Sequence, residues 1–301
     1  MGGLNYQVNL ISALLEFENQ RVEPILFLGD DVSIEVLERF NALDGLKIVH
    51  SQVFNRYHKN RRLLKAIVTG CDADALAVFK LHEIDVNERL HVVNFSVPVH
   101  PIKFDFEALL AKYNLPRHFF YLPNQFWQHK NHECVIKALG IAKREGKDIV
   151  VAVSGNHEDS RDPDYLPKLL SLITAESVEE NFRVLGMIPY EDVQALMLSA
   201  AALINPSRFE GWSTTVEEAK SLGVEMLLSD IHVHREQAEK YAQFFGQDIP
   251  SQLADIMSKS PKVDIDKRVQ DLGNALKESN YRMSLFAARF SNVVEMALKS
   301  L

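Results

Sequence analysis

The chain has 301 residues, of which 47% are hydrophobic and 25% charged, and its formal net charge is −8. This length accommodates two domains of ordinary size, and the acidic balance argues against broad binding to nucleic acid. Two cysteines are too few for a disulfide framework or a zinc site, which favours the reducing cytoplasm. No apolar stretch approaches the roughly 20 residues that span a bilayer.

One basic cluster, Lys59-Asn60-Arg61-Arg62, leaves two interpretations open. It could meet a phosphate or an acidic membrane surface, or it could be a solvated face of the protein. We favour the solvated face, and peripheral contact with a membrane stays the alternative.

The N-terminal third alternates helix and strand patterns. An amphipathic helix is expected over Val8 to Glu18, and Gly2-Gly3 before it suggests a turn that leads into a helix. The following elements are expected at Pro24 to Leu28 (strand), Ser33 to Asn41 (helix) and Leu46 to Val49 (strand), with the same alternation continuing over Leu64 to Val68, Ala73 to Val78 and Leu90 to Val93. The segment from Asn94 to Asp105 holds Pro98 and Pro101 without helical periodicity, so we expect a linker there.

The rest of the chain alternates more regularly, which favours a parallel sheet with covering helices. Strands are expected over Phe119 to Leu122, Asp148 to Val153, Phe182 to Leu185, Ala200 to Ile204 and Met226 to Asp230, and helices over His132 to Arg144, Glu191 to Ser199, Gln252 to Met257, Asp264 to Glu278 and Tyr281 to Leu298. Ser154-Gly155-Asn156 marks a turn where the backbone can approach a ligand.

The most informative segment runs from Asn205 to Ala219, between a buried strand and a helix. Thr214 and Glu217 have the spacing of a capping box, so the free N–H groups of the helix's first turn should point into the crevice above the strand's carboxyl end. That is where α/β proteins bind anions. Glu210 on the turn and Glu218 in the helix flank this position, where carboxylates can accept hydrogen bonds from hydroxyls. A ligand with both phosphate and hydroxyl groups fits the arrangement.

Lys130 lies just past a strand and at the start of a helix, where a lysine can act as a point charge on a phosphate. Taken alone, Lys130 is better interpreted as a surface residue near a loop. When Lys130 is considered together with Glu210, Glu218 and the turn at Ser154-Gly155, we favour its contact with a phosphate.

Other kinds of site lose support. The histidine pairs His129 with His132 and His232 with His234 lack a third ligand within local spacing, so no metal site is expected. The sequence contains no Gly-x-Ser-x-Gly elbow, His-Glu-x-x-His helix or P-loop, which argues against serine hydrolases, zinc peptidases and Walker-type ATPases.

The segment from Phe209-Glu210-Gly211-Trp212 to Glu218-Ala219, with Lys130 upstream and Leu222-Gly223 downstream, resembles the retaining, nucleotide-sugar-dependent glycosyltransferases of family 4, the glycosyltransferases group 1. Val184 to Pro189 and Ser229 to Glu236 add to the resemblance, which covers about residues 107 to 301 and extends loosely to the N-terminal part. The family has the α/β GT-B fold, in which two Rossmann-like, doubly wound parallel-sheet domains face a cleft. The resemblance therefore implies a shortened acceptor-side domain over 1–104, a donor-binding domain over 105–280 and a helix over 281–301 that crosses back.

The resemblance also implies roles for individual residues. Glu210 would contact hydroxyls of the donor sugar, and Lys130 would neutralise the departing diphosphate. Glu218 would hold the ribose hydroxyls. The other residues implied in donor binding are Gly2, Gly3, Gln125, Ser154, Gly155, Met187, Ile188, Ser207, Gly211, Trp212 and Ser213. Cationic side chains and a helix dipole would take the place of a metal, so no metal and no cofactor besides the nucleotide-sugar substrate are expected.

The sequence departs from the family pattern at three places. An arginine often stands five positions before the lysine, where this chain has Gln125, and the common Gly-x-Pro reads Gly223-Val224-Glu225. The N-terminal region has only about 100 residues, against roughly 150 for a full doubly wound domain.

The leading hypothesis is a cytoplasmic glycosyltransferase of the hexosyltransferase type, active in polysaccharide biosynthesis. It would transfer a sugar from a UDP- or GDP-sugar to a hydroxyl of a glycan or lipid-linked acceptor, with retention of configuration. The alternative is a catalytically impaired nucleotide-sugar-binding protein with an eroded or truncated acceptor domain. A sugar-nucleotide epimerase of the same fold is a third and less favoured hypothesis.

Overall fold

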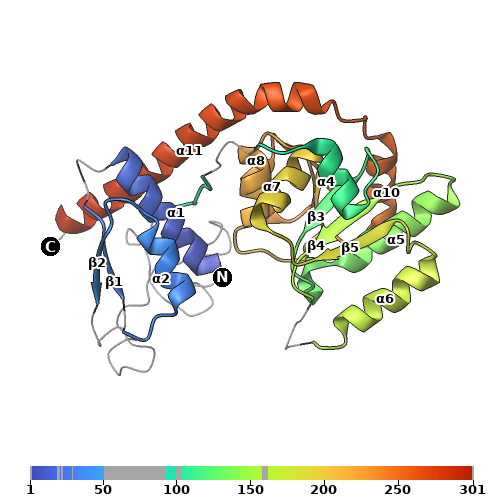
Figure 1. Cartoon of the computed structure of the whole chain (residues 1–301), viewed down its shortest axis with the longest axis horizontal. Helices are drawn as coiled ribbons and strands as arrows, with labels where there is room; N and C mark the ends of the chain where they lie inside the picture. The colour runs from blue at the N-terminus through green and yellow to red at the C-terminus, as the bar shows by residue number, and fades with distance from the viewer. Residues whose placement is uncertain are drawn as a thin grey trace. The chain divides into compact units, whose positions relative to one another are not determined.

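A computed structural model describes residues 2–18, 21, 23–28, 30–50, 93–98, 103–157 and 162–299 (Figure 1). The chain divides into two compact units, of which the first takes residues 1–98 and 278–301 and the second takes residues 99–277. The alternating patterns at 64–68 and 73–78, most of the one at 90–93, and the basic cluster at 59–62 lie outside the described residues.

The second unit is built on a six-stranded, all-parallel sheet with the strand order β5-β4-β3-β6-β7-β8. The strands are β3 (Phe120–Pro123), β4 (Val151–Ser154), β5 (Phe182–Gly186), β6 (Leu203–Asn205), β7 (Met226–Ser229) and β8 (Ala242–Phe245). The order runs outward in both directions from β3 and β6, as in a doubly wound, Rossmann-like domain. The switch point therefore lies between β3 and β6, and such sheets bind their ligands over the carboxyl ends of the strands there.

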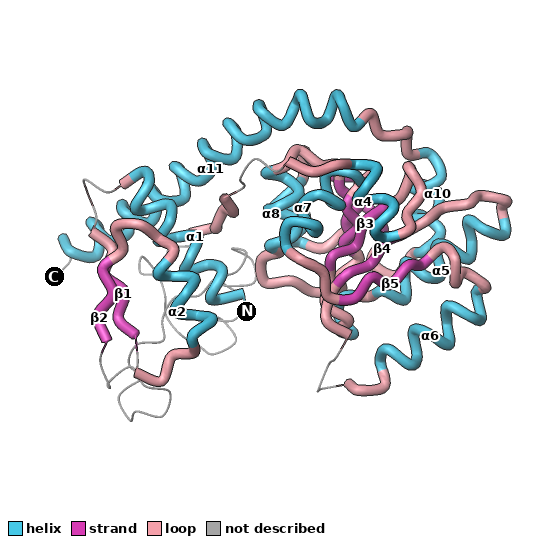
Figure 2. The backbone as a smooth tube through the Cα atoms, viewed as in Figure 1, coloured by secondary structure: helices cyan, strands magenta, loops and turns pink. Residues whose placement is uncertain are grey.

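Helices cover both faces of this sheet, as Figure 2 shows on either side of the strands β3, β4 and β5. The helices α5 (His132–Arg144), α6 (Tyr165–Glu176) and α10 (Pro250–Lys259) cover one face, and α4 (Phe106–Tyr113), α7 (Tyr190–Ser199) and α8 (Thr214–Ser221) cover the other. Phe120 and Leu122 pack into the core beside α5, whereas Phe119 and Tyr121 pack beside α7 and α8, because successive side chains of a strand point to opposite faces. All four side chains are 0% exposed, so β3 is buried on both sides.

The loops that follow β3 and β4 approach each other closely at Gly155. The φ of Gly155 is +150°, and a Cβ there would lie 2.3 Å from the carbonyl oxygen of Asn124. Only glycine allows this approach. The Phe126 N–H donates to the carbonyl oxygen of Asn156 at 3.0 Å, and the Asn156 N–H donates to Gln125 Oε1 at 2.8 Å. The turn expected after β4 is thus confirmed, and it is fixed to the loop that follows β3.

The described part of the first unit contains a parallel pair of strands and helices that pack on an aromatic core. Its elements are α1 (Gly2–Phe17), β1 (Ile25–Leu28), α2 (Ile34–Asn41), β2 (Lys47–His50) and the later part of α11 (Ile265–Lys299). The Tyr6 ring of α1 lies edge-on to Phe95 and Phe286, with centroid distances of 5.8 and 5.7 Å. Burial raises the pKa of Tyr6 to about 12, so its hydroxyl stays neutral.

Several expected elements differ from the observed ones. Gly2 and Gly3 form the first turn of α1, so the expectation of a loop at these residues is wrong. The two helices expected at the end of the chain are one helix, α11, because the residues from Glu278 to Tyr281 include no proline or glycine that would end it. The strand β6 begins at Leu203 rather than at Ala200, where it was expected to begin.

Among the described α-helices and strands of the second unit, the sequence patterns did not predict α4, α6, α9 (His232–Ala238) and β8. Pro167 obscured α6, although it occupies the first turn, where a missing N–H costs no hydrogen bond. Within the described ranges, no helix combines the length and the apolar character needed to cross a membrane.

Candidate functional site

A buried ion pair occupies the switch point of the six-stranded sheet. Lys130 ends the short 3-10 helix η4 (Gln128–Lys130) that follows β3, and Glu210 lies on the loop that follows β6. The Lys130 Nζ lies 2.6 Å from Glu210 Oε1, and the two side chains are only 12% and 9% exposed. Removal of either partner would leave an uncompensated charge at this depth, so each stabilises the other.

Neighbouring side chains hold the Glu210 carboxylate in place. Ser207 Oγ lies 2.7 Å and Asn205 Nδ2 3.4 Å from the same oxygen, Oε1. Burial raises the pKa of Glu210, but the charge of Lys130 and the hydrogen bonds from Lys130 and Ser207 outweigh it, so the pKa lies below its ordinary value. In the part of the chain that the structure describes, the hydrogen bonds to this carboxylate fall on Oε1, which leaves Oε2 for a ligand.

Buried asparagines join the two loops at the switch point. Asn124, directly after β3, donates through Nδ2 to Asn205 Oδ1 at 3.2 Å. Asn131, between η4 and α5, donates through Nδ2 to the carbonyl oxygens of Pro206 at 3.1 Å and Gln247 at 2.9 Å. These bonds fix the distance between the loop that carries Lys130 and the loop that carries Glu210.

Helix α8 begins at the end of the Glu210 loop, and its N-cap residue is Ser213. The expectation of a capping box between Thr214 and Glu217 is wrong. No side chain caps this helix, because Ser213 Oγ accepts a hydrogen bond from Asn205 Nδ2 at 3.0 Å, and Glu217 Oε1 instead accepts one from Gln237 Nε2 at 3.1 Å. The first-turn N–H groups therefore keep the partial positive charge that attracts an anion.

Glu218 lies in α8 and is partly exposed. The Tyr190 hydroxyl donates to Glu218 Oε1 at 2.9 Å. Burial raises the pKa of Glu218 to about 7, although the hydrogen bond from Tyr190 opposes this shift. The carboxyl group therefore changes its charge near neutral pH, and a ligand hydroxyl that donates to it would favour the ionised form.

The other residues expected in donor binding differ in their surroundings. Ser154 Oγ lies 2.6 Å from Tyr121 Oη in the interior, and Gln125 holds the β4 turn, so both side chains already have partners within the protein. Met187, after β5, is 72% exposed. A Cβ on Gly211 would meet no atom within 4 Å, which leaves open space beside the Glu210 loop.

The remaining members of the expected set fall into three places. Ile188 packs against the core beside α7, Trp212 is half-buried on the Glu210 loop, and Gly2 and Gly3 belong to the first unit. The structure thus brings Lys130, Glu210, Ser207 and Ser213 together within the second unit.

Sequence reasoning assigned no role to two residues that support the Glu210 loop. Ser229, at the end of β7, donates through Oγ to the Ser207 carbonyl oxygen at 2.5 Å. Gln237 of α9 binds Ser213 twice, accepting from its N–H and donating to its carbonyl oxygen, both at 3.0 Å. The available signal for Ser229 was a polar residue at the end of an apolar strand. The structure places no group of three His, Cys, Asp or Glu residues, among those it describes, where they could hold a metal ion.

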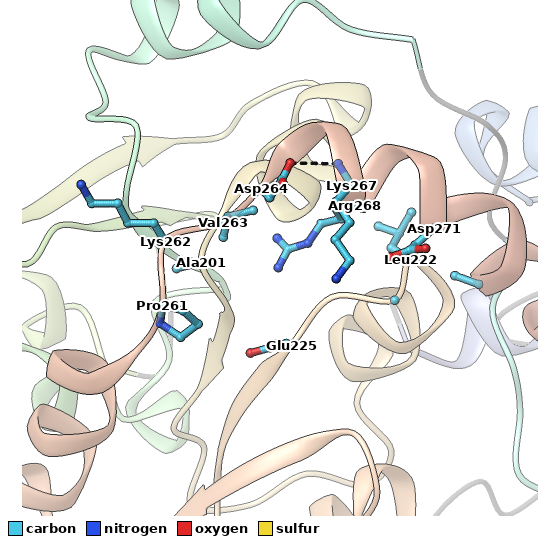
Figure 3. Close-up of a pocket in the computed structure, with 12 residues that line it drawn as sticks. Ala201, Leu222, Glu225, Pro261, Lys262, Val263, Asp264, Lys267, Arg268 and Asp271 are labelled. Atoms are coloured by element: carbon cyan, nitrogen blue, oxygen red, sulfur yellow. Dashed lines mark hydrogen bonds between the residues drawn. The ribbon is translucent and has the colours of Figure 1, made fainter.

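A separate pocket of about 340 Å³ opens at the opposite edge of the sheet (Figure 3). Ala201 and Glu225 line it, and they come just before β6 and β7, at the amino ends of the strands. Arg268 of this pocket donates to two carbonyl oxygens at the end of α7, and Asp264 accepts a first-turn N–H of α11. These two side chains serve the ends of helices, and the pocket is not part of the site at the carboxyl edge.

Comparison with solved structures defines the class of fold. A glycosyltransferase from Rickettsia africae is 14% identical, with a TM-score of 0.59 over 97% of this chain and 81% of that one. HepE from Anabaena, in complex with UDP and glucose, is 16% identical, with a TM-score of 0.62 over 98% of this chain and 76% of that one. At these identities the likeness shows the fold alone, and it confirms the α/β GT-B class expected from the sequence.

The sequence comparison defines the family. Residues 106–260, more than half of the chain, match the family described as Glycosyl transferases group 1, so the chain belongs to this family. The O-antigen biosynthesis glycosyltransferase WclY of Escherichia coli is 23% identical over 164 residues, which are 51% of this chain and 44% of that protein. The chain therefore matches less than half the length of this relative.

The ion pair predicts a specific pattern of stability. Replacement of Lys130 by Met should lower the free energy of unfolding by about 3 kcal/mol at pH 7, because the Glu210 carboxylate stays buried without its cation. The double variant K130M/E210Q should recover most of this loss. The pair's contribution is present above about pH 4.5 and is lost as the pH falls through the lowered pKa of Glu210. Urea denaturation of the full chain measures each value.

A matched control comes from an exposed ion pair. Lys137 lies 2.7 Å from Glu133 on the surface of α5, with side chains 44% and 40% exposed. Lys137→Met should cost less than about 0.5 kcal/mol, because water solvates both charges. If Lys130→Met and Lys137→Met lower the free energy of unfolding equally, the buried ion pair contributes no more to stability than the exposed one.

Proposed function

We propose that the chain is a retaining glycosyltransferase that transfers a hexose from a UDP- or GDP-sugar to a hydroxyl of a glycan or a lipid-linked acceptor. The observation that carries this proposal is the buried pair of Lys130 and Glu210 at the switch point, next to the uncapped N-terminus of α8. A nucleotide-sugar offers the complementary groups, since its diphosphate is anionic and its sugar carries hydroxyl donors. Membership of the glycosyltransferase family supports transfer rather than binding alone.

Each end of the ion pair has a role in this proposal. The ammonium of Lys130 and the first-turn N–H groups of α8 face the diphosphate and stabilise the negative charge that develops as it leaves. Glu210 Oε2 accepts a hydrogen bond from a sugar hydroxyl, while Oε1 stays with Ser207 and Asn205. The open space at Gly211 leaves room for the sugar beside this carboxylate.

The transfer step balances without a protein nucleophile. The bond between the anomeric carbon and the diphosphate oxygen breaks, and the acceptor oxygen forms a bond to the same face of that carbon, which retains its configuration. The departing phosphate, held by Lys130, takes the proton of the acceptor hydroxyl. The products are the glycosylated acceptor and the nucleoside diphosphate, and we propose that no metal ion or further cofactor takes part.

Glu218 and the segment after β5 complete the donor site in this proposal. The carboxylate of Glu218 accepts hydrogen bonds from the ribose hydroxyls, and the base lies near Met187 and Ile188. The exposed side chain of Met187 supports this placement, because an apolar side chain in water can cover the face of a base.

The relatives support the biological setting of the proposal. WclY is named for O-antigen biosynthesis, and the HepE structures hold UDP, UDP-glucose or UDP with glucose. We propose a related role in polysaccharide biosynthesis for this chain, in the cytoplasm.

One observation favours a second candidate, a protein that binds nucleotide-sugars without transferring them. Gln125 stands where the family often has an arginine, and its side-chain oxygen is bound to the Asn156 N–H at 2.8 Å. A neutral amide leaves Lys130 with a larger share of the diphosphate charge. A binder would need less of this charge compensation than a transferase.

Calorimetry and a release assay test the proposed function. The full chain, titrated with UDP, GDP, UDP-glucose and GDP-mannose, should bind one of the nucleotides, and Glu218→Ala should lower that affinity about tenfold by removing the ribose acceptor. Release of nucleoside diphosphate on addition of a glycan acceptor identifies a transferase, and Lys130→Ala should abolish this release. Binding without release indicates the second candidate, and the absence of any nucleotide binding refutes both.

The raised pKa of Glu218 predicts a pH dependence of nucleotide binding. Because ribose hydroxyls donate to the ionised carboxylate, the affinity should fall by up to about tenfold per pH unit below about 7. The same raised pKa makes the free energy of unfolding fall as the pH rises from about 4.5 to about 7. Titrations of nucleotide between pH 5.5 and 8 measure the first effect, and urea denaturation measures the second.

Two variants make this pH dependence specific. Glu218→Gln cannot ionise, so it should flatten both pH profiles. Glu180→Gln removes a carboxylate whose side chain is 88% exposed and should leave both profiles unchanged. A wild-type affinity that does not vary between pH 5.5 and 8 would contradict the role of Glu218.

A further inference from the structure

His234 is a buried imidazole with one unsatisfied nitrogen. It is the third residue of α9, the helix whose Gln237 binds Ser213 at the end of the Glu210 loop, and it is 0% exposed. Its Nδ1 lies 2.9 Å from the carbonyl oxygen of Ser229. A carbonyl oxygen only accepts hydrogen bonds, so Nδ1 carries the proton and Nε2 presents a lone pair. Nε2 is buried and has no hydrogen-bond partner among the described residues.

The ring belongs to the same network as Glu210. Ser229 binds the carbonyl oxygen of Ser207, and Ser207 Oγ lies 2.7 Å from Glu210 Oε1. His234 and Gln237 lie three residues apart on α9 and therefore share a face of that helix. Gln237 binds both backbone groups of Ser213, which places this face against the Glu210 loop.

Burial keeps the His234 ring neutral. Burial lowers the pKa of His234 most strongly, and Lys130 lowers it further, while the hydrogen bond to Ser229 and the charge of Glu210 raise it. The net pKa lies below its ordinary value, so Nε2 stays an acceptor at neutral pH. A buried acceptor without a donor costs free energy, which a ligand donor would recover.

We propose that His234 Nε2 accepts a hydrogen bond from a hydroxyl of the sugar portion of the donor and is a specificity-determining residue of the site. The inference rests on the proposed function. A phosphate is excluded as the partner because its oxygens, like Nε2, are acceptors, whereas every sugar hydroxyl can donate. Nε2 is buried in the structure, so the proposal requires the side chains that cover it to move as the donor binds.

The test compares the nucleotide with its sugar conjugate by calorimetry on the full chain at pH 7.5, with UDP against UDP-glucose and GDP against GDP-mannose. His234→Asn keeps a donor for the Ser229 carbonyl oxygen but removes the acceptor at the position of Nε2. It should weaken the sugar conjugate about tenfold and change the affinity for the free nucleotide by less than about twofold. His234→Gln, whose longer amide reaches further, should recover part of the loss.

A matched control and a stability measurement complete the design. His118 lies before β3, at the amino edge of the sheet, and its Nδ1 is also buried without a partner among the described residues. His118→Asn should leave both affinities unchanged, and thermal melting identifies any variant that fails to fold. If His234→Asn alone fails to fold, the comparison uses His234→Gln, which should weaken the sugar conjugate by less than about tenfold and bind the free nucleotide as the wild type does.

The outcomes separate this inference from the function on which it rests. Equal loss of affinity for the nucleotide and the sugar conjugate would show that His234 only supports the loop, and no loss of either would show that Nε2 does not contact the sugar. Both results overturn the inference while nucleotide binding stands. A wild type that binds neither ligand overturns the proposed function and the inference with it.

Discussion

Lys130 and Glu210 meet where both side chains are largely shielded from water, and each needs the other because an unpaired charge at that depth costs several kcal/mol. The parallel sheet makes this meeting possible. The carboxyl ends of β3 and β6 lie side by side at the switch point, so the loops that follow them converge although 80 residues separate the two side chains. The bonds of Asn124 and Asn131 across these loops then fix the spacing.

The same arrangement suits a ligand that carries both charge and hydroxyl groups. The two charges compensate each other in the structure, so neither is buried alone. A nucleotide-sugar offers a new partner to each end, with its diphosphate for Lys130 and its hydroxyls for Glu210. Support from Ser207, Ser229 and Gln237 keeps the carboxylate in position, so little reorganisation is needed when the ligand binds.

The sequence singled out Lys130 and Glu210 because their signals are local. Apolar runs end in polar residues at Pro123-Asn124 and at Asn205, and parallel strands bring such ends to one edge. The ion pair between the two side chains was not predicted, because Lys130 was expected to contact a phosphate instead. The absence of the capping box could not be predicted from the sequence. Ser213 is hydrogen-bonded to Asn205 and Gln237, which only the folded chain brings close. The continuity of α11 and the use of Gln125 within the protein depend on tertiary contacts in the same way.

The central claim is that the ion pair at the switch point is half of a donor site, and a crystal structure of the full chain with a bound UDP-sugar or GDP-sugar tests it most directly. The account predicts the diphosphate beside the Lys130 ammonium and a sugar hydroxyl within hydrogen-bond distance of Glu210 Oε2. Nucleotide bound instead in the pocket at the amino edge, beside Arg268, with the Lys130–Glu210 pair undisturbed, would contradict the account.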